Sequence, residues 1–374
     1  MKRFESGVYI NQGTYKSFNP EFINRQWDLD NIEVISLLSK ADRHLGRLDM
    51  YSEYIPNIDL FISMHVLKEA TQSSKIEGTK TNIEEALRAK SDISEEKRND
   101  WDEVQNYINA LNDAITSLKN IPFSTRLIRR THNILLQGVR GKHKLPGEFR
   151  SSQNWIGGAS INDATFVPPH FEQISHLMSD LEKFAHNESI LLPDVLKIAL
   201  IHYQFETIHP FLNGNGRVGR LMITLYLVEN QILKRPILYL SDFFERNRSL
   251  YYSNLMRVRE QNDIQQWFKF FLVGVIETAK SSIGTFDKIL KLQKEVDEKL
   301  QKLNSRANNA RKVLKQLYQH PIIDVNKVGE ITGLSTPSSY TLISELESLN
   351  IIEEITGAKR GKNYWFKDYI EIFK

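Results

Sequence analysis

The sequence predicts a mainly α-helical protein with a β-hairpin flap in its middle and a small separate domain at its C-terminal end. Apolar residues recur at intervals of three and four along most of the chain, which is the helical period. Turn-forming residues with short apolar runs interrupt that period between residues 146 and 169. A long, increasingly charged stretch then precedes a fresh set of short elements. We therefore divide the chain into residues 1–100, 101–285 and 286–374.

The composition excludes several classes of function. The chain has 374 residues, enough for two or three domains, with 41% hydrophobic and 25% charged residues. Its 49 Lys and Arg against 46 Asp and Glu leave a net charge of +3, too little to indicate a nucleic acid or a membrane surface. The absence of cysteine excludes disulfides, thiolate nucleophiles and Cys-bound metals. No apolar signal segment or membrane-spanning stretch is present, so we expect a cytoplasmic protein without membrane contact.

The N-terminal region is predicted to carry one long amphipathic helix between Leu60 and Ile76. The first 55 or so residues contain scattered aromatic side chains and turn formers, and the first long apolar periodicity begins at Leu60. Gly78 lies where a helix C-terminus places a residue with left-handed backbone, so this helix should end near Glu77. A second helix follows with two glutamates in its first turn.

The middle of the chain is predicted to form helices around a flap. Segments 101–120 and 125–138 have the helical period, whereas residues 146–169 carry Gly-Gly and Asn-Asp turn pairs that indicate a hairpin or a long flap. From Pro193 the helical period resumes and brings His209 to the end of a helix. A glycine-containing loop then separates this helix from a second, strongly apolar one.

The last part of the chain is predicted to form a connector helix and a winged-helix domain. Roughly residues 262 to 305 are helical and charged, which suits a connector. Three short helices and an alternating segment follow, and this order is typical of a winged helix. The helices run through Val313 and Leu317, from Val325 to Ile331 and from Pro337 to Leu349, and the hairpin from Ile351 to Phe373.

The residues from His209 to Arg220 concentrate a titratable base, a glycine loop and two arginines. Glycines let backbone N–H groups approach phosphate oxygens, and the N-terminus of the following helix adds partial positive charge. Arg217 and Arg220 lie three apart at that helix start, so both are expected on one side, where they can bind phosphate oxygens. An imidazole at the mouth of the loop can accept a proton from an attacking hydroxyl at neutral pH.

The residue spacing in this segment also matches two other kinds of site. Gly214, Gly216 and Gly219 match the spacing of a dinucleotide-binding turn, but that turn follows a strand, and the preceding segment here has helical period. His202, Glu206 and His209 share one helix face, which could indicate a metal site, but a di-iron bundle needs a second Glu-x-x-His and the sequence has none. We favour His202 and Glu206 as a satisfied core pair.

The segment resembles the signature of the Fic family, His-x-Phe-x-(Asp or Glu)-Gly-Asn-Gly-Arg-x-x-Arg, and matches all its fixed positions except the acidic one. Residues 146–169 are similar to the family's flap, and Tyr251 and Tyr252 to a pair lining its nucleotide pocket. The sequence from Ser73 to Gly78 fits the family's inhibitory motif, (Ser or Thr)-x-x-x-Glu-(Gly or Asn). The resemblance covers roughly residues 10 to 280 and implies a Fic helical core with a β-hairpin flap and an N-terminal inhibitory helix.

The resemblance implies an activity, transfer of AMP from ATP to a Ser, Thr or Tyr hydroxyl of a target protein. His209 would be the general base and Phe211 the anchor of the loop, and the flap would pair with the target as an added strand. Glu77 would pair with Arg220 and so keep the γ-phosphate from its productive position. The implied nucleotide-binding residues are Asn213, Gly214, Asn215, Gly216, Arg217, Val218, Gly219, Arg220, Tyr251 and Tyr252; the inhibitory motif is represented by Ser73, Glu77 and Gly78, and the flap by Asn154, Trp155, Ile156 and Gly157.

Asn213 departs from the signature. In the family this position is a carboxylate that holds the Mg²⁺ bridging the α- and β-phosphates. An amide oxygen can ligate a hard cation but brings no charge, so affinity for Mg²⁺ should fall. The sequence leaves three outcomes open: a slow transferase, a transferase in which the phosphates hold the ion largely by themselves, or an altered nucleotide chemistry.

Two alternatives to the transferase remain. Glu77 could orient water in an enzyme that removes AMP from a modified protein. The C-terminal domain could instead make the chain a DNA-binding regulator with a nucleotide-sensing Fic domain, although from Arg306 to the end ten Lys or Arg oppose eight Asp or Glu. Protein docking or homodimerisation is the other role open to that domain. The side chains suited to DNA phosphates are Ser335, Thr336, Ser338, Ser339, Tyr340, Lys359, Arg360 and Lys362.

Overall fold

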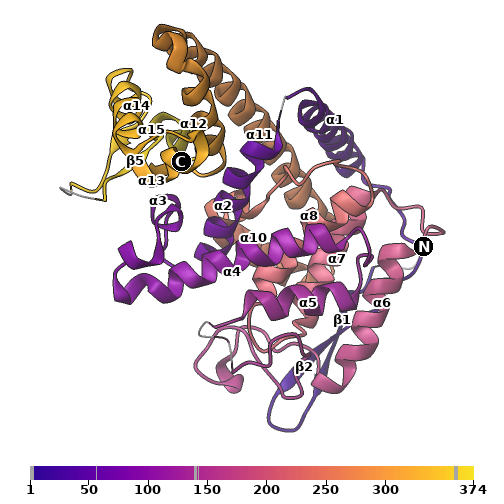
Figure 1. Ribbon diagram of the computed structural model, residues 1–374. Coiled ribbons are helices and arrows are strands. Elements are labelled where there is room, and N and C mark those ends of the chain that lie inside the picture. Colours follow the sequence, from indigo (N-terminus) through magenta and orange to yellow (C-terminus); the bar gives the residue numbers. More distant parts are fainter. Residues whose placement is uncertain (1–3, 56, 139–140, 142, 358–360) are drawn as a thin grey trace.

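The computed structural model describes residues 4–55, 57–138, 141, 143–357 and 361–374, and it is mainly helical with two small antiparallel sheets (Figure 1). The helices of the first two thirds are α1 (Ile32–Tyr54), α2 (Asp59–Ile76), α3 (Ile83–Leu87), α4 (Glu95–Ser117), α5 (Thr125–Leu135), α6 (Ile174–His186), α7 (Asp194–Ile208), α8 (Asn215–Glu229), α9 (Ser241–Arg246) and α10 (Arg248–Gln261). The remaining helices are α11 (Ile264–Leu300), α12 (Ala307–Gln319), α13 (Val325–Thr332), α14 (Thr336–Ser348) and α15 (Lys367–Glu371). The strands are β1 (Gly7–Asn11), β2 (Lys16–Pro20), β3 (Ile322–Asp324), β4 (Glu353–Glu354) and β5 (Asn363–Trp365).

The centre of the fold is the pair of helices α7 and α8. Every residue of α7 from Val195 to Ile208 is buried, as expected for a helix that is covered on all sides. α8 packs against α7 and also contacts α2, α4 and α5, while α6 and α11 cover other faces of α7. The loop between these two central helices is therefore held by rigid elements. Among the described residues, no helix is both long and apolar enough to cross a membrane.

The helices predicted between residues 60 and 228 are all present, whereas α1, the β1–β2 hairpin and α6 were missed. α1 was not expected; it packs along α11 through Val34, Leu38, Ala41, Leu45 and Leu48. These residues are spaced alternately four and three apart, so they form a narrow stripe with only one apolar position per turn. The β1–β2 hairpin, in which Val8 faces Asn19, was also missed.

In its described residues the C-terminal unit contains four helices, α12 to α15, and a three-stranded sheet in the order β3-β5-β4. The predicted hairpin from Ile351 to Phe373 is shorter than expected, because the chain leaves the sheet after Trp365 and forms α15. Its tip, with Lys359 and Arg360, lies outside the described residues. The identification of this unit as a winged helix stays a prediction.

The proposed domain boundaries fall inside helices. The boundary between residues 100 and 101 lies within α4, and that between residues 285 and 286 lies within α11. α11 belongs at one end to the packing around α7 and continues, through a short 3₁₀ segment at Gln301–Arg306, to α12 of the C-terminal unit. The chain thus passes between its regions through continuous helices, and the division into three domains stays a prediction.

Candidate active site

The loop between α7 and α8 has the helix–loop–helix form that the sequence predicted. His209 follows the last residue of α7 with a left-handed backbone, φ 50°, and its N–H donates to the carbonyl of Phe205 at 2.9 Å. Gly214, with φ 78°, precedes α8, whose N-terminus has no side-chain cap. The first N–H groups of α8 therefore remain available as donors to an anion. The fold places His209 and these donors at the two ends of one short loop.

The loop is anchored by Phe211 and Asn215. The Phe211 ring is fully buried and stacks on the His132 ring at 3.7 Å between centroids, in agreement with the anchoring role that the resemblance implies. The Asn215 side chain accepts a hydrogen bond from the Phe211 N–H and donates one to the Phe211 carbonyl, both at 2.8 Å. Asn215 therefore shapes the loop through its side chain, and any ligand contact must come from its backbone.

Two buried residues that the sequence analysis missed join the loop to the flap. His132 accepts a hydrogen bond from the Gly147 N–H at 2.8 Å, so its other nitrogen carries the proton and donates to the Asn213 carbonyl at 2.9 Å. Arg150 donates to the carbonyls of His209 at 3.0 Å and Pro169 at 2.6 Å. Neither residue lies in a recognisable motif, and only the packing of α5 and of the flap's base against the loop reveals them.

A cavity of about 500 Å³ opens between the loop, α10 and the flap. Its residues come from segments far apart in the sequence, and the predicted sites account for much of its wall. The lining residues are Glu77, Trp155, Ile156, Gly157, Thr165, Phe166, Glu206, His209, Gly216, Arg220, Tyr251, Tyr252, Leu255, Met256 and Arg259.

The flap is a hairpin held by a single bridge. Ile156 and Phe166 exchange two backbone hydrogen bonds, of 2.8 and 3.1 Å. Asn154 does not line the cavity; its side-chain amide donates to the Phe211 carbonyl at 3.0 Å and so fixes the flap to the loop. Trp155 is 43% exposed at the rim. The flap therefore covers one side of the cavity and presents an exposed apolar residue beside it.

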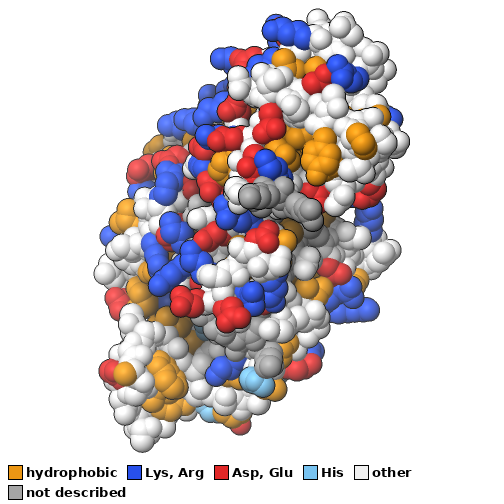
Figure 2. Space-filling model, turned by 60° about the vertical axis from the view of Figure 1, so that its left-hand side comes forward, with side chains coloured by type: hydrophobic (Ala, Val, Ile, Leu, Met, Phe, Trp, Pro, Cys, Tyr) orange, Lys and Arg blue, Asp and Glu red, His pale blue; other side chains and the backbone are white. Residues whose placement is uncertain are grey.

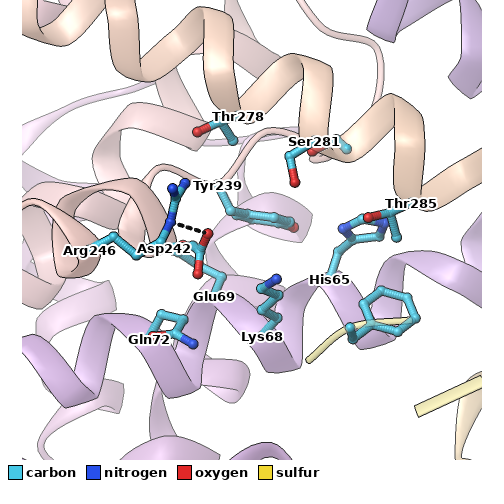
Figure 3. A pocket seen from close by; sticks show the side chains of 12 residues that line it. His65, Lys68, Glu69, Gln72, Tyr239, Asp242, Arg246, Thr278, Ser281 and Thr285 are labelled. Carbon is cyan, nitrogen blue, oxygen red and sulfur yellow. Dashed lines mark hydrogen bonds and ion pairs between the residues drawn. The ribbon is translucent and has the colours of Figure 1, made fainter. Parts of the chain in front are cut away.

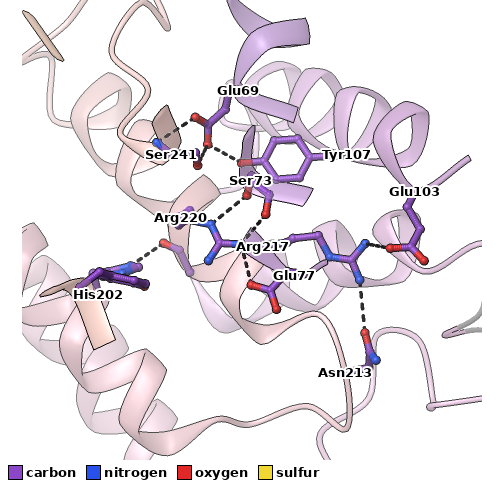
Figure 4. Close-up of polar contacts among 12 residues, drawn as sticks. Glu69, Ser73, Glu77, Glu103, Tyr107, His202, Asn213, Arg217, Arg220 and Ser241 are labelled. Carbon is purple, nitrogen blue, oxygen red and sulfur yellow. Dashed lines mark hydrogen bonds and ion pairs between the residues drawn. The ribbon is translucent and has the colours of Figure 1, made fainter. Parts of the chain in front are cut away.

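Arg220 points from α8 to the end of α2, as Figure 4 shows. Its guanidinium donates to the Ser73 hydroxyl at 2.9 Å, to the Ser73 carbonyl at 2.8 Å and to Glu77 Oε1 at 2.7 Å. Burial opposes ionisation of Glu77, but the charge and hydrogen bond of Arg220 outweigh it and lower the pKa of Glu77. The predicted pairing of Glu77 with Arg220 is therefore present, and Gly78 ends the motif with φ 99°.

Glycines at positions 216 and 219 allow two carboxylates to approach α8. A Cβ atom on Gly216 would lie 2.3 Å from Glu77 Oε1, and one on Gly219 would lie 2.3 Å from Glu206 Oε1. Both distances are too short for any side chain. The surface of α8 that a phosphate would approach is thus already in contact with the Glu77 carboxylate.

Arg217 does not share the direction of Arg220. It donates to Glu103 of α4 at 3.0 Å and to Asn213 Oδ1 at 3.2 Å, and it does not line the cavity (Figure 4). The side chains of Arg217 and Glu103 are 4% and 9% exposed. The expectation that both arginines face one ligand is therefore wrong for this structure, because α4 supplies a buried carboxylate that the sequence analysis did not foresee.

The residues around Asn213 do not suit a protein-held Mg²⁺. The Oδ1 atom of Asn213 accepts a hydrogen bond from a guanidinium, so the oxygen that would face a metal faces a positive charge. The described part of the chain contains no group of three or more His, Cys, Asp or Glu side chains arranged to hold a metal ion. The position keeps an oxygen ligand without the negative charge that would draw a cation to it.

Only one of His202 and Glu206 is the satisfied core residue that the sequence suggested for both. His202 is fully buried and pairs with the Gly219 carbonyl at 2.9 Å and the Tyr251 hydroxyl at 2.8 Å. Glu206 is 6% exposed, lines the cavity and has no hydrogen-bond partner at Oε1. Burial raises the pKa of Glu206 to about 7, despite the opposing charge of Arg220. His202 is a satisfied core residue, whereas Glu206 belongs to the candidate site.

The imidazole of His209 is neutral at physiological pH. Burial and the charges of Arg150 and Arg259 lower the pKa of His209 to about 3, although Glu77 acts in the opposite direction. Its Nδ1 atom is buried without a hydrogen-bond partner. A neutral ring that faces a cavity can accept a proton from a group bound there.

The remaining predicted residues divide between core and cavity. Tyr251 is buried and stacks on Phe244 at 4.5 Å, while Tyr252 is 41% exposed, and both line the cavity. The Val218 side chain is fully buried in the core, so only its backbone could meet a nucleotide. Arg259, which the sequence analysis did not select, lies over the Phe166 ring at 3.8 Å and thereby supports the flap from α10.

The fold and the loop define the class of this protein: a helical domain that presents a histidine and a glycine turn beneath a hairpin flap. Two family models match the chain, Fic/DOC family N-terminal over residues 35–116 and Fic/DOC family over residues 122–227. The chain belongs to the Fic/DOC family. This result agrees with the resemblance drawn from the sequence.

Relatives and solved structures extend the comparison. A probable protein adenylyltransferase of Aquifex aeolicus is 30% identical over 157 residues, which cover 40% of this chain and 44% of the relative. The protein adenylyltransferase Fic of Drosophila melanogaster is 32% identical over 129 residues, 33% of this chain and 23% of the relative. The chain thus spans less than half the length of these curated relatives.

The solved structures support the fold. A Fic family protein from Desulfovibrio desulfuricans has a TM-score of 0.57 at 18% identity and covers 91% of this chain and 98% of its own. Fic-1 of C. elegans has a TM-score of 0.53 at 19% identity, over 70% of this chain and 74% of its own. The mainly helical Fic fold is therefore confirmed.

Proposed function

We propose that this protein is a protein adenylyltransferase that moves AMP from ATP to a Ser, Thr or Tyr hydroxyl of a target protein. The observation that carries the proposal is the 500 Å³ cavity, in which a neutral imidazole, a free helix N-terminus and Arg220 face the edge of the flap. The printed names of the relatives from Aquifex and Drosophila, which match part of the chain, also support it.

The chemistry assigned to the loop is an in-line displacement at the α-phosphorus. The N–H groups at the start of α8 and the Arg220 guanidinium would bind phosphate oxygens. The target hydroxyl oxygen would form a bond to the α-phosphorus while the bond to the bridging oxygen breaks, and pyrophosphate would leave with that electron pair. His209 would take the hydroxyl proton.

The target would be held by the flap. The extended backbone at residues 153–157 offers an edge to which a target segment could be added as a strand, so that recognition of its main chain would direct one side chain toward His209. The exposed Trp155 at the rim supports this role, because an aromatic side chain there would be covered when the target binds.

Glu77 is proposed to inhibit the transfer. It forms an ion pair with the guanidinium that the γ-phosphate would need, and a carboxylate and a phosphate cannot share that donor without repulsion. A charge-assisted hydrogen bond of this kind contributes about 1.5–3 kcal/mol, so Glu77→Gly should raise AMP transfer about 10- to 100-fold.

Labelled ATP tests the proposal. The parent, Glu77→Gly and Glu77→Gly/His209→Ala proteins should be incubated with target-containing extract and with α-labelled or γ-labelled ATP. We expect protein to gain label from the α position only, more with Glu77→Gly, and none without His209. Label from the γ position, or undiminished labelling without His209, would contradict the proposal.

The metal ion, the alternative reaction and the cellular location predicted from the sequence are also proposals. A Mg²⁺ ion held mainly by the phosphates of ATP is compatible with Asn213. Removal of AMP from a modified protein, with Glu77 orienting water, is the second candidate reaction, and release of AMP from pre-modified target would distinguish it. A cytoplasmic location is likewise proposed.

DNA binding and a homodimer gain no support from the features described. Positive and negative side chains are interspersed over the face shown in Figure 2. Ser335, which precedes α14, and Thr336, Ser338 and Tyr340 of that helix are exposed, but Ser339 is fully buried and unavailable to a phosphate. A salt-dependent shift of duplex DNA would establish DNA binding by this unit.

A further inference from the structure

The helix that carries the inhibitory motif touches two distant parts of the molecule. Phe61, His65, Glu69, Ser73 and Glu77 are spaced four apart from the start of α2 to the residue after it. Such residues lie on successive turns, in a row that winds slowly around the helix. The members of this row contact, in order, the C-terminal unit, the core and the nucleotide cavity.

The N-terminal half of α2 is covered by the C-terminal unit (Figure 1). Phe61 is fully buried and lies edge-on to the Tyr318 ring of α12 at 5.2 Å, with the Tyr369 ring of α15 at 6.4 Å. One turn further, the His65 ring lies 5.1 Å from the ring of Phe373. The last helix and the C-terminal end of the chain are therefore packed directly on the inhibitory helix.

The C-terminal residue extends this contact past α2. Lys374 forms an ion pair with Glu84 at the start of α3, just beyond the segment that contains Glu77. The Ser63 hydroxyl donates to the Gln319 carbonyl at 3.0 Å on the other side of the contact. The C-terminal unit thus holds the start of α2 and also the helix that follows the inhibitory motif.

A buried hydrogen-bonded contact lies in the middle of α2, where the helix also packs on α4 and α9. Glu69 is 3% exposed, and its Oε1 accepts hydrogen bonds from the Tyr107 hydroxyl at 2.8 Å and the Ser241 hydroxyl at 2.6 Å. Burial raises the pKa of Glu69 even though both hydroxyls stabilise its charge. This contact forms a pivot between the half of α2 that meets the C-terminal unit and the half that meets Arg220.

A polar cavity of about 40 Å³ lies behind α2 next to this pivot (Figure 3). The His65 Nε2 and Tyr239 Oη atoms are buried beside it and have no hydrogen-bond partner, and Phe373 is one of the lining residues. Close packing would resist a shift of the helix, whereas unfilled space beside unsatisfied groups leaves room for one. The remaining walls come from Lys68, Glu69, Gln72, Asp242, Arg246, Thr278, Ser281, Ser282 and Thr285.

We propose that the C-terminal unit sets the level of inhibition by holding α2 and α3 in the position that brings Glu77 to Arg220. This inference rests on the proposed function, because it explains how that same site is regulated. When the C-terminal unit leaves α2, the helix loses the contacts that fix one end, shifts about Glu69 toward the cavity and withdraws Glu77. A partner that binds the surface covering Phe61 would therefore activate transfer.

Charge reversal at the C-terminus tests this coupling without creating a cavity in the core. Lys374→Glu places a carboxylate opposite Glu84 and should weaken docking. Lys367→Glu is the matched control, because Lys367 pairs with Glu353 inside the C-terminal unit at 3.1 Å. Phe373→Ala is the second test variant. Each change is made in the parent and in Glu77→Gly, and circular dichroism verifies that the C-terminal unit remains folded.

The measurements are AMP transfer and hydrogen exchange of residues 71–78. In the parent, Lys374→Glu and Phe373→Ala should raise transfer about fivefold or more and speed exchange, while Lys367→Glu changes neither. In the Glu77→Gly background the same substitutions should leave transfer unchanged, because the inhibitory carboxylate is already gone. Unchanged exchange, or an equal rise in both backgrounds, would overturn the coupling. If Glu77→Gly transfers no AMP at all, the proposed function fails, and the exchange of residues 71–78 alone decides the coupling.

Discussion

Arg217 and Arg220 lie three residues apart on α8, and each is paired with a carboxylate from an N-terminal helix, yet their surroundings differ. The pair of Arg217 with Glu103 is almost fully buried and lies outside the cavity. In the pair of Arg220 with Glu77, the arginine is 1% exposed but the carboxylate is 33% exposed and lines the cavity. Glu77 is accessible from the cavity, whereas Glu103 is buried away from it. The difference suggests that one ion pair regulates and the other maintains structure.

The two ion pairs should differ most in how much each contributes to the free energy of unfolding. Glu103→Ala leaves a buried guanidinium without its carboxylate and should lower the free energy of unfolding by about 3–5 kcal/mol. Glu77→Gly should lower it by only about 1 kcal/mol, because its carboxylate is partly screened by water and Arg220 keeps its bonds to Ser73. Urea unfolding of both variants measures the contrast. Equal losses, or a rise in AMP transfer with Glu103→Ala, would remove the distinction.

Glu206 can be compared with Glu77 and Glu103, because it is a carboxylate near Arg220 that has no hydrogen-bond partner at Oε1. Its pKa of about 7 exceeds the ordinary value of 4.5, so the folded state holds this proton more tightly than the unfolded state does. Stability should therefore fall as pH rises from about 4.5 to about 7, by about 3 kcal/mol at most.

Glu206→Gln should remove that pH dependence, because the amide has the shape of the protonated acid and does not ionise. Buried histidines such as His202 and His209, whose pKa values are lowered to about 3, act in the opposite direction below about pH 6.5, so the difference between variant and parent is the quantity to measure. Thermal unfolding from pH 5 to 8 provides it. Parallel curves would show that Glu206 is ionised throughout.

The smallest expected effect concerns Asn213, whose amide oxygen accepts from Arg217. Asn213→Asp adds a negative charge near the phosphates, which at about 4 Å in a well-solvated site is about 1 kcal/mol, or about fivefold in affinity for Mg²⁺. The Mg²⁺ concentration for half-maximal ATP binding should fall by that factor. An unchanged titration would show that position 213 does not contact the ion and that its carboxylate pairs with Arg217 alone.

The sequence was most informative where local pattern determines backbone. The helical period up to His209, the glycines after it and the motif from Ser73 to Gly78 predicted the two helix ends that meet at the site. The ion pair of Glu77 with Arg220 was expected because the family resemblance linked two segments that lie far apart in the sequence. The structure places both side chains together at 2.7 Å.

The sequence was least informative where a side chain's partner comes from another helix. Arg217 and Arg220 have the same local spacing, but α4 brings Glu103 to one and α2 brings Glu77 to the other. His202 and Glu206 are four apart on α7, yet the Tyr251 hydroxyl satisfies only the first. The spacing of residues along a helix predicts which side chains share a face. The partners of those side chains depend on how the helices pack, which the spacing does not predict.

The absence of a side chain at Gly216 limits how the proposed inhibition could be lost by mutation. A methyl group there would collide with the Glu77 carboxylate, but it would also obstruct the backbone that a phosphate must reach. A substitution at this position is therefore expected to impair the proposed AMP transfer as well as its inhibition. Natural variants that escape inhibition are accordingly expected to change α2, or the C-terminal residues that pack on it, and to retain glycine at 216.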